Sequence, residues 1–499
     1  MKSIISLLIA VVLSFNISAQ QKTNSTAAEE LKIRNEIYVN VELPSDQNVK
    51  QQLEKLNKVI SVDSYDQDKN IATAYVTIHQ FNSFIELGLN YTLLTPPSLL
   101  LNRSELDGSY TKGTNDWDYY PNYTQYLDMM NQFEMDYPDI CEVVSIGQSN
   151  EGREILFLHI NNNLGEDADE PEFMYTSSIH GDEITGYVLM LRLSDYLLTN
   201  YGVLDKVTNL VDNIDIWINP LANPDGTFAG GDNSVYGATR SNAMGVDMNR
   251  NYADPEDGNH PDGNQYQTET VLFMDFAEER DFIMSANFHG GAEVLNYPWD
   301  TWSKLAADDD WWYFVCRDYA DTVHLYSPSN YLNEFDNGVT NGYQWYSISG
   351  GRQDYMNYFH HCRELTVEIS STKLPPASQM PSFWDYNYRS LLNYMEATLY
   401  GARGVVTDYF TGDPMVAKVF IAMHDKDESY VYSSMPAGDY HRLLKQGLYN
   451  LTFSAFGYYD KTISMVDISD YQTEILNVEL EPNVGLVGDN KVEISIYPN

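Results

Sequence analysis

Residues 173–198 read FMYTSSIHGDEITGYVLMLRLSDYLL, and this stretch indicates the fold of the middle of the chain. It begins as an apolar, strand-like run, and from Tyr187 onward its apolar residues have the spacing of a helix. The same alternation recurs in the strand-like run 214–218 and the helical run 389–399. Strands that alternate with helices predict an α/β domain around a mostly parallel or mixed sheet, here over residues 115–400.

Two smaller regions flank this domain, and the first is N-terminal. Strand-like runs at 37–41 and 72–78 enclose a helical run at 49–59. Thr95-Pro96-Pro97 then forms a natural boundary. We therefore expect residues 20–101 to form a small α/β domain.

The second flanking region is C-terminal and contains short strands only, such as 404–406, 418–422 and 449–453. This pattern predicts a small β-sandwich over residues 402–482. Residues 483–499 read as a Gly/Asn linker followed by one more strand from Val492.

The composition limits the classes of partner. The 499 residues include 72 acidic and 29 basic side chains, a formal charge of −43. Nucleic acids and anionic membranes would repel such a chain, so neither is expected as a partner. A basic ligand is compatible with the charge, and so is a surface whose charge only keeps the protein in solution. The three cysteines provide neither a disulfide framework nor a thiolate zinc site.

The first nineteen residues have the pattern of a secretory signal peptide. Lys2 supplies a positive start, Ile4 to Phe15 is apolar, and Ile17-Ser18-Ala19 precedes Gln20. No later stretch is apolar and long enough to cross a bilayer. We expect an exported, soluble protein without an integral membrane segment, and a monomer.

Two histidines have surroundings that suggest a metal site. His180 and Glu183 stand three residues apart at the start of a predicted helix, where an imidazole and a carboxylate can face one point. His289 ends the apolar run 282–288 and precedes two glycines, a place suited to the edge of a cleft. Zinc accepts such nitrogen and oxygen ligands. Taken singly, the HxxE spacing arises by chance and His289 could be a structural histidine.

Other polar residues are candidates for anion binding and for catalysis. Arg240, Asn249 and Arg250 cluster in a chain with few basic residues, a pattern that fits carboxylate binding and fits ordinary surface ion pairs equally well. Glu368 lies within the β-branched strand 365–369, where it either faces solvent or is a costly buried acid with a role.

These residues belong to a set of segments that resembles the zinc metallocarboxypeptidases, in particular the regulatory branch typified by carboxypeptidases D, E and N. The segments occur in the order of that family: 180–183, 223–226, 240–252, 287–291, 296–300, 341–351, 364–371 and 375–378. The resemblance implies a mixed-sheet α/β/α catalytic domain over residues 115–400. Residues 402–482 also resemble the transthyretin-like β-sandwich that follows it in this branch.

The resemblance implies one zinc ion per catalytic domain, bound by His180, Glu183 and His289 with water in the fourth place. Asp247 would orient one ligand imidazole from behind. Glu368 would be the general base that takes a proton from the water and passes it to the leaving amine. The implied activity is a metallocarboxypeptidase, a secreted zinc exopeptidase.

The resemblance also implies how a substrate is held. Arg240 would stabilise the oxyanion, while Asn249 and Arg250 would bind the terminal carboxylate and Tyr346 would close over it. Asp300 and Gln353 match positions that line the pocket for the terminal side chain. An acid there favours Lys or Arg, so the expected substrates are peptides and proteins with free, basic C-termini.

Both ends of the chain raise further hypotheses. The regulatory branch generally lacks an activation segment, whereas digestive relatives have one. Residues 20–101 are therefore interpreted as a pro-domain, with a folding aid and an accessory domain as alternatives. The tail from Val492 resembles the first strand of the sorting domains of the type IX secretion system, which would carry the protein to the outer membrane or the extracellular medium. A plain terminal strand is the alternative.

Two other functions compete with the main one. A zinc amidase or carboxypeptidase could act on cell-wall peptides, and an inactive protein could use the cleft to bind peptide C-termini. The complete ligand set and Glu368 argue against an inactive protein, and Arg240, Arg250 and Asp300 argue for ordinary peptides with basic ends.

Overall fold

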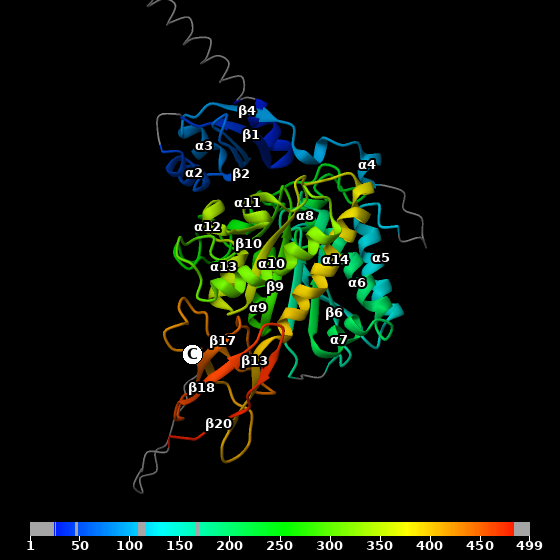
Figure 1. Cartoon of the computed structure of the whole chain (residues 1–499). Helices are drawn as coiled ribbons and strands as arrows, with labels where there is room; N and C mark the ends of the chain where they lie inside the picture. The colour runs from blue at the N-terminus through cyan, green and yellow to red at the C-terminus, as the bar shows by residue number, and fades with distance from the viewer. Residues whose placement is uncertain (1–23, 25, 45–47, 108–115, 166–168, 484–499) are drawn as a thin grey trace, which may run out of the picture. The chain divides into compact units, whose positions relative to one another are not determined.

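The computed structural model describes residues 24, 26–44, 48–107, 116–165 and 169–483 (Figure 1). The predicted signal segment 1–19 and the predicted tail strand from Val492 lie outside the described residues. The chain divides into two compact units, of which the first reaches Thr398 and the second comprises the residues from Leu399 together with 165–170.

An eight-stranded sheet forms the centre of the first unit, in the order β11-β10-β12-β9-β7-β8-β6-β5. The four middle strands, β12, β9, β7 and β8, are parallel, and antiparallel pairs flank them on both sides. The predicted mixed sheet is thus confirmed. The strands are β5 (Cys141–Gln148), β6 (Glu154–Ile160), β7 (Glu172–Ser177), β8 (Asp215–Asn219), β9 (Phe282–His289), β10 (Ala292–Tyr297), β11 (Val339–Asn341) and β12 (Arg363–Ser370).

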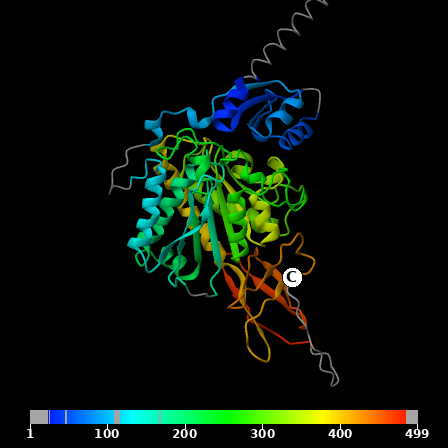
Figure 2. The same ribbon diagram turned by 180° about the vertical axis from the view of Figure 1, so that it is seen from behind.

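Helices cover both faces of this sheet, as the alternation of side chains along β7 shows. Met174 packs into a core cluster with Phe273 and Met356 on one face, whereas the hydroxyl of Tyr175 donates to the Leu391 carbonyl on the other. Figures 1 and 2 view the unit from opposite sides. The helices are α5 (Tyr123–Asp136), α6 (Thr185–Asn200), α7 (Asp205–Asn213), α8 (Pro224–Thr227), α9 (Thr268–Glu278), α10 (Asp309–Tyr326), α11 (Glu334–Asn337), α12 (Gly342–Trp345), α13 (Arg352–Phe359) and α14 (Met380–Glu396), with the 3₁₀ turns η2 (Met248–Arg250), η3 (Ala377–Gln379) and η4 (Ala397–Leu399).

The N-terminal part of the first unit is a four-stranded antiparallel sheet in the order β2-β3-β1-β4. Its core is its own: Ile37, Val39, Ala74 and Phe84 are among the residues of a separate buried cluster. Strand β2 is an edge of this sheet. The elements are β1 (Glu36–Glu42), α2 (Val49–Asn57), β2 (Ser61–Asp66), β3 (Ile71–Thr77), α3 (Phe81–Glu86), β4 (Tyr91–Leu94), η1 (Pro97–Leu99) and α4 (Arg103–Asp107).

The second unit contains two four-stranded sheets around one buried core, as expected for a β-sandwich. One sheet has the order β16-β13-β19 with β20 also on β13, and the other has the order β15-β14-β17-β18. The strands are β13 (Gly401–Asp408), β14 (Lys418–Ile421), β15 (Val431–Tyr432), β16 (Asp439–Arg442), β17 (Gly447–Ser454), β18 (Lys461–Ile468), β19 (Thr473–Ile475) and β20 (Val478–Leu480). Within the described residues, no helix has the length and apolar character that a membrane span requires.

Candidate active site

The predicted metal ligands lie at the carboxyl ends of neighbouring parallel strands. His180 lies three residues after the end of β7 at Ser177, and His289 is the last residue of β9. Glu183 lies in the turn before α6. Because β7 and β9 are hydrogen-bonded neighbours, the sheet itself brings the two histidines together.

The ligand atoms of His180, Glu183 and His289 all lie within 4.8 Å of one another, and all three residues are buried. The Nδ1 atoms of both histidines lie 3.0 and 2.8 Å from the Oε2 atom of Glu183. Burial lowers the pKa of His289 to about 4, so its imidazole is neutral and able to act as a ligand. Two imidazole nitrogens and a carboxylate that converge in this way fit a zinc ion with a coordination position left for water or substrate.

Asp247 holds His180 from behind. Its Oδ1 lies 3.0 Å from the Nε2 atom of His180, which leaves the Nδ1 atom of that ring for the metal. Its Oδ2 accepts a hydrogen bond from Nε of Arg240. Although burial alone would raise the pKa of Asp247, Arg240 and His180 hold it well below its usual range. Asp247 is therefore an anion placed to fix the ligand ring.

Arg240 lies beside the metal ligands rather than on the surface. Its Nη1 atom donates to the Oε1 atom of Glu183 at 3.0 Å, and the residue is 4% exposed. The alternative of an ordinary surface ion pair is wrong for this residue.

Glu368 is buried in β12, so it does not face solvent. Its Oε2 atom is buried and has no hydrogen-bond partner among the described residues. Burial and the neighbouring Glu183 raise its pKa well above the usual range. A carboxylate in this state is suited to accept and hold a proton.

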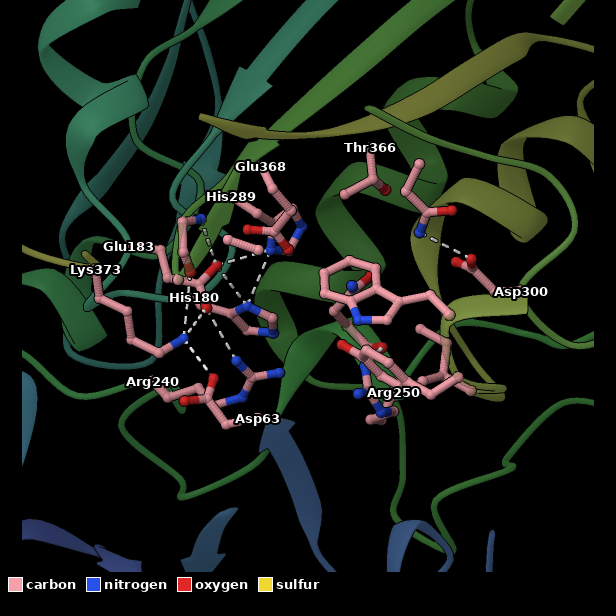
Figure 3. A pocket seen from close by; sticks show the side chains of 18 residues that line it. Asp63, His180, Glu183, Arg240, Arg250, His289, Asp300, Thr366, Glu368 and Lys373 are labelled. Atoms are coloured by element: carbon pink, nitrogen blue, oxygen red, sulfur yellow. Dashed lines mark hydrogen bonds and ion pairs between the residues drawn. The ribbon is translucent and has the colours of Figure 1, made fainter. Parts of the chain in front are cut away.

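The residues expected to bind the terminal carboxylate line the same cavity as the metal ligands (Figure 3). Asn249 and Arg250 belong to η2, which Asp247 caps by accepting the Asn249 N–H. The Nη2 atom of Arg250 is buried and lacks a hydrogen-bond partner within the described structure. A buried guanidinium nitrogen without a partner is a site for an anion. Tyr346, at the end of α12, also lines the cavity.

Asp300 lies at another part of the cavity wall and is 3% exposed. It accepts a hydrogen bond from Nδ2 of Asn296 at 3.0 Å, yet burial raises its pKa to about 6. Gly342 leaves room for it, since a Cβ atom there would lie 1.8 Å from the Asp300 Oδ1 atom. Gln353 is buried on α13, and its side chain is not among those that line the cavity. Its place in the pocket stays a prediction.

Among the lining residues that the sequence analysis did not single out are Thr366, Lys373 and Asp63. Thr366 precedes Glu368 by two residues on β12, so the period of a strand could have placed it on the same face. The Lys373 Nζ atom donates to Glu183 Oε1 and to the Gly290 carbonyl. Asp63 comes from β2 of the N-terminal sheet, and no local pattern marks it.

The comparisons with known proteins agree with this site. Residues 126–390 match the family model described as zinc carboxypeptidase. Carboxypeptidase D of Mus musculus is 35% identical over 347 residues, which cover 66% of this chain and 24% of that protein. Carboxypeptidase N catalytic chain of Homo sapiens is 32% identical over 384 residues, which cover 70% of this chain and 82% of that protein. The chain thus spans about a quarter of the length of carboxypeptidase D.

A solved structure shows the same fold. Carboxypeptidase A from Helicoverpa armigera superposes with a TM-score of 0.56 at 19% identity and covers 73% of this chain and 97% of that chain. At this level of identity the likeness concerns the fold, and the site rests on the geometry above.

Proposed function

Because the chain belongs to the zinc carboxypeptidase family, we propose that it releases single C-terminal residues from peptides and proteins and prefers Lys and Arg. The observation that carries this proposal is that one cationic and one anionic side chain line the same cavity. Arg250 offers an unpartnered guanidinium nitrogen, and Asp300 offers a buried carboxylate. A terminal residue with a free carboxylate and a cationic side chain complements both.

The residues of the site divide the chemistry between them. His180, Glu183 and His289 hold the zinc ion, which when bound polarises the scissile carbonyl and lowers the pKa of the attacking water. Glu368 takes the proton of that water and delivers it to the leaving amine. Arg240 stabilises the negative charge that develops on the carbonyl oxygen.

Recognition of the terminal carboxylate explains why the enzyme would act as an exopeptidase. Arg250 and Asn249 bind that carboxylate, and Tyr346 covers it. A substrate without a free C-terminus would leave the buried Nη2 atom of Arg250 without a partner, which costs binding energy at this position. Internal peptide bonds are therefore poor substrates.

The two alternative functions receive no support from the site. An inactive binding protein would be expected to lack a ligand or the base, yet the metal ligands and Glu368 are all in place. Arg240, Arg250 and Asp300, which line one cavity, together favour ordinary peptides with basic ends. The results of the experiments can still favour either alternative.

The experiment compares one blocked peptide ending in Arg as a free acid and as an amide. We expect release of Arg from the free acid and release slower by at least about a hundredfold from the amide, because two buried contacts to the carboxylate are lost. Equal rates would contradict carboxylate recognition. Arg250→Ala should remove most of the difference, because one of the two contacts to the carboxylate is lost. Asp310→Ala, which changes an exposed acid on α10, serves as the control.

The remaining proposals concern the export and the oligomeric state of the protein. Residues 1–19 direct export as a signal peptide, and the tail from Val492 directs the type IX route. The working form is a monomer. Light scattering of the purified protein tests the last of these proposals, and the N-terminal sequence of the exported protein tests the first.

A further inference from the structure

Asp354 lies behind Asp300 and binds the backbone that carries this acid. Its Oδ1 atom accepts the N–H group of Asp300 at 3.0 Å, and its Oδ2 atom accepts the N–H group of Thr301 at 2.8 Å. Asp354 belongs to α13 and is 1% exposed, and it is not among the residues that line the cavity. It therefore contacts the support of Asp300 and not the space that a substrate would fill.

The segment 298–301, which carries Asp300, lies outside any helix or strand and depends on such contacts. The carbonyl groups of Trp299 and Asp300 accept the N–H groups of Tyr343 and Ile348 at 2.9 and 3.3 Å. Within the described structure, the acceptor for the N–H groups of Asp300 and Thr301 is the Asp354 carboxyl group. The position of the Asp300 backbone therefore depends on Asp354.

Helix α13 also supports the amide that is proposed to bind the terminal carboxylate. The N–H group of Arg352, the first residue of α13, donates to Oδ1 of Asn249 at 2.9 Å, which leaves the Nδ2 atom for a carboxylate. The guanidinium of Arg352 lies 3.2 Å from Glu364, and the two side chains are 2% and 0% exposed. One anchored helix thus supports Asn249 and Asp300, which are proposed to recognise two parts of the same terminal residue.

Stability alone does not explain an acid at position 354. Among the described residues, Asp354 forms hydrogen bonds with backbone N–H groups and no ion pair with a cation. Burial and the neighbouring Asp300 raise the pKa of Asp354 well above its usual range, so a charge is unfavourable there. An apolar residue would avoid this cost. What the acid provides is two oxygens that accept two buried N–H groups.

We infer that Asp354 is a positioning residue for the proposed preference, because its carboxyl group fixes the Asp300 backbone and so directs the Asp300 side chain toward a cationic terminal side chain. The role of Asp354 rests on the proposed function, since it acts through Asp300. Loss of Asp354 should weaken binding of a basic terminal residue and leave the chemistry at the metal ligands unchanged. An apolar terminal residue does not use Asp300 and should be released as before.

The test compares Asp354→Ala, Asp300→Ala and the double variant in the full-length, zinc-loaded protein. Alanine removes both acceptor oxygens of Asp354, and the double variant shows whether Asp354 acts through Asp300. Asp354→Asn keeps the volume and one acceptor oxygen, so it serves as a second, milder variant. The substrates are blocked peptides that differ only in a terminal Arg or Phe.

The matched control is Asp308→Asn. Asp308 is another buried acid, 2% exposed, which pairs with Arg363 and does not line the cavity. Its substitution therefore reports what the loss of a buried carboxylate does to the protein in general. Hydrogen exchange at the N–H groups of Asp300 and Thr301 reports the Asp354 contact independently of activity.

We expect Asp354→Ala to raise KM for the Arg peptide by at least about tenfold, with kcat and the kinetics of the Phe peptide within about twofold of the wild type. Asp354→Asn should raise the same KM by about threefold or more, because one buried N–H group loses its acceptor. In the Asp300→Ala background, loss of Asp354 should change the Arg-to-Phe ratio by less than about twofold. Exchange at Asp300 and Thr301 should become faster in both Asp354 variants and stay unchanged in Asp308→Asn.

Four results would overturn the inference. An Arg-to-Phe ratio that stays at the wild-type value in both Asp354 variants would show that Asp300 does not need this support. Unchanged exchange would show that Asp354 does not hold the segment. Equal losses for the Arg and Phe peptides would indicate a general structural role. A further fall of the ratio in the Asp300→Ala background would show that Asp354 attracts the cation by itself.

Failure of the proposed function would be visible separately, in the wild type. Equal release of Arg and Phe by the wild type would contradict the proposed preference and the use of Asp300 in it. The exchange measurement would then decide the contact between Asp354 and the Asp300 backbone by itself.

Discussion

Glu368 on β12 is the register partner of His289 on β9. The sheet thus sets the distance between the proposed general base and a metal ligand, because two paired residues of adjacent strands are fixed by backbone hydrogen bonds. A loop would hold such a pair less firmly.

Glu368→Gln should reduce kcat by about 10²–10⁴-fold, the usual contribution of general acid–base catalysis. Zinc content should stay the same, because Glu368 is not one of the three converging ligands. Steady-state kinetics and metal analysis of the same sample check this prediction. A decrease in kcat of less than tenfold would contradict the role of Glu368 as the general base.

Asp300→Ala should abolish most of the preference for Arg over Phe while turnover of small substrates changes less. The cationic side chain loses its buried partner, whereas the residues at the metal are untouched. Ratios of kcat/KM for matched peptides measure the effect, with Asp310→Ala as the control. A ratio within about twofold of the wild type would contradict the role of Asp300.

The preference for Arg should depend on pH through Asp300. Burial raises the pKa of this carboxyl to about 6, so it is ionised above that pH and neutral below it. The Arg-to-Phe ratio of kcat/KM should therefore rise as the pH increases from 5 to 7 and then level off. Groups at the metal affect both peptides alike and cancel in the ratio. A ratio that is flat across this range would contradict the prediction.

Gly342→Ala should act on the same pocket without removing a charge. The new methyl group would lie 1.8 Å from Asp300 Oδ1, so the carboxylate must move. We expect weaker binding of Arg-ending peptides by about tenfold or more, with normal zinc content. Asp310→Ala, which changes an exposed side chain on α10, is a suitable control. Unchanged KM in Gly342→Ala would mean that Asp300 does not contact the substrate.

Much of this site could be predicted from the sequence, because it depends on strand ends and short spacings. His180 and His289 each end an apolar run, and parallel neighbours bring such ends together. Glu183 and Asp247 lie in the segments 180–183 and 240–252, which belong to the resemblance to the zinc carboxypeptidases.

The docking of the N-terminal sheet could not be predicted in the same way. Asp63 and Lys373 are far apart in the chain, and their contact depends on how two sheets with separate cores meet. Alternation of apolar residues identifies the core of each layer but carries no information on polar contacts between them. The sequence does not predict strand β2 either, because its residues SVDSYD include few apolar ones.

The most direct test of the central claim measures release of free amino acid from paired blocked peptides ending in Arg or Phe, with and without a zinc chelator. The account predicts release of Arg well above that of Phe, and loss of both when the chelator is present. Equal release of Phe would contradict the role of Asp300, and release that persists with the zinc removed would contradict the catalytic site itself.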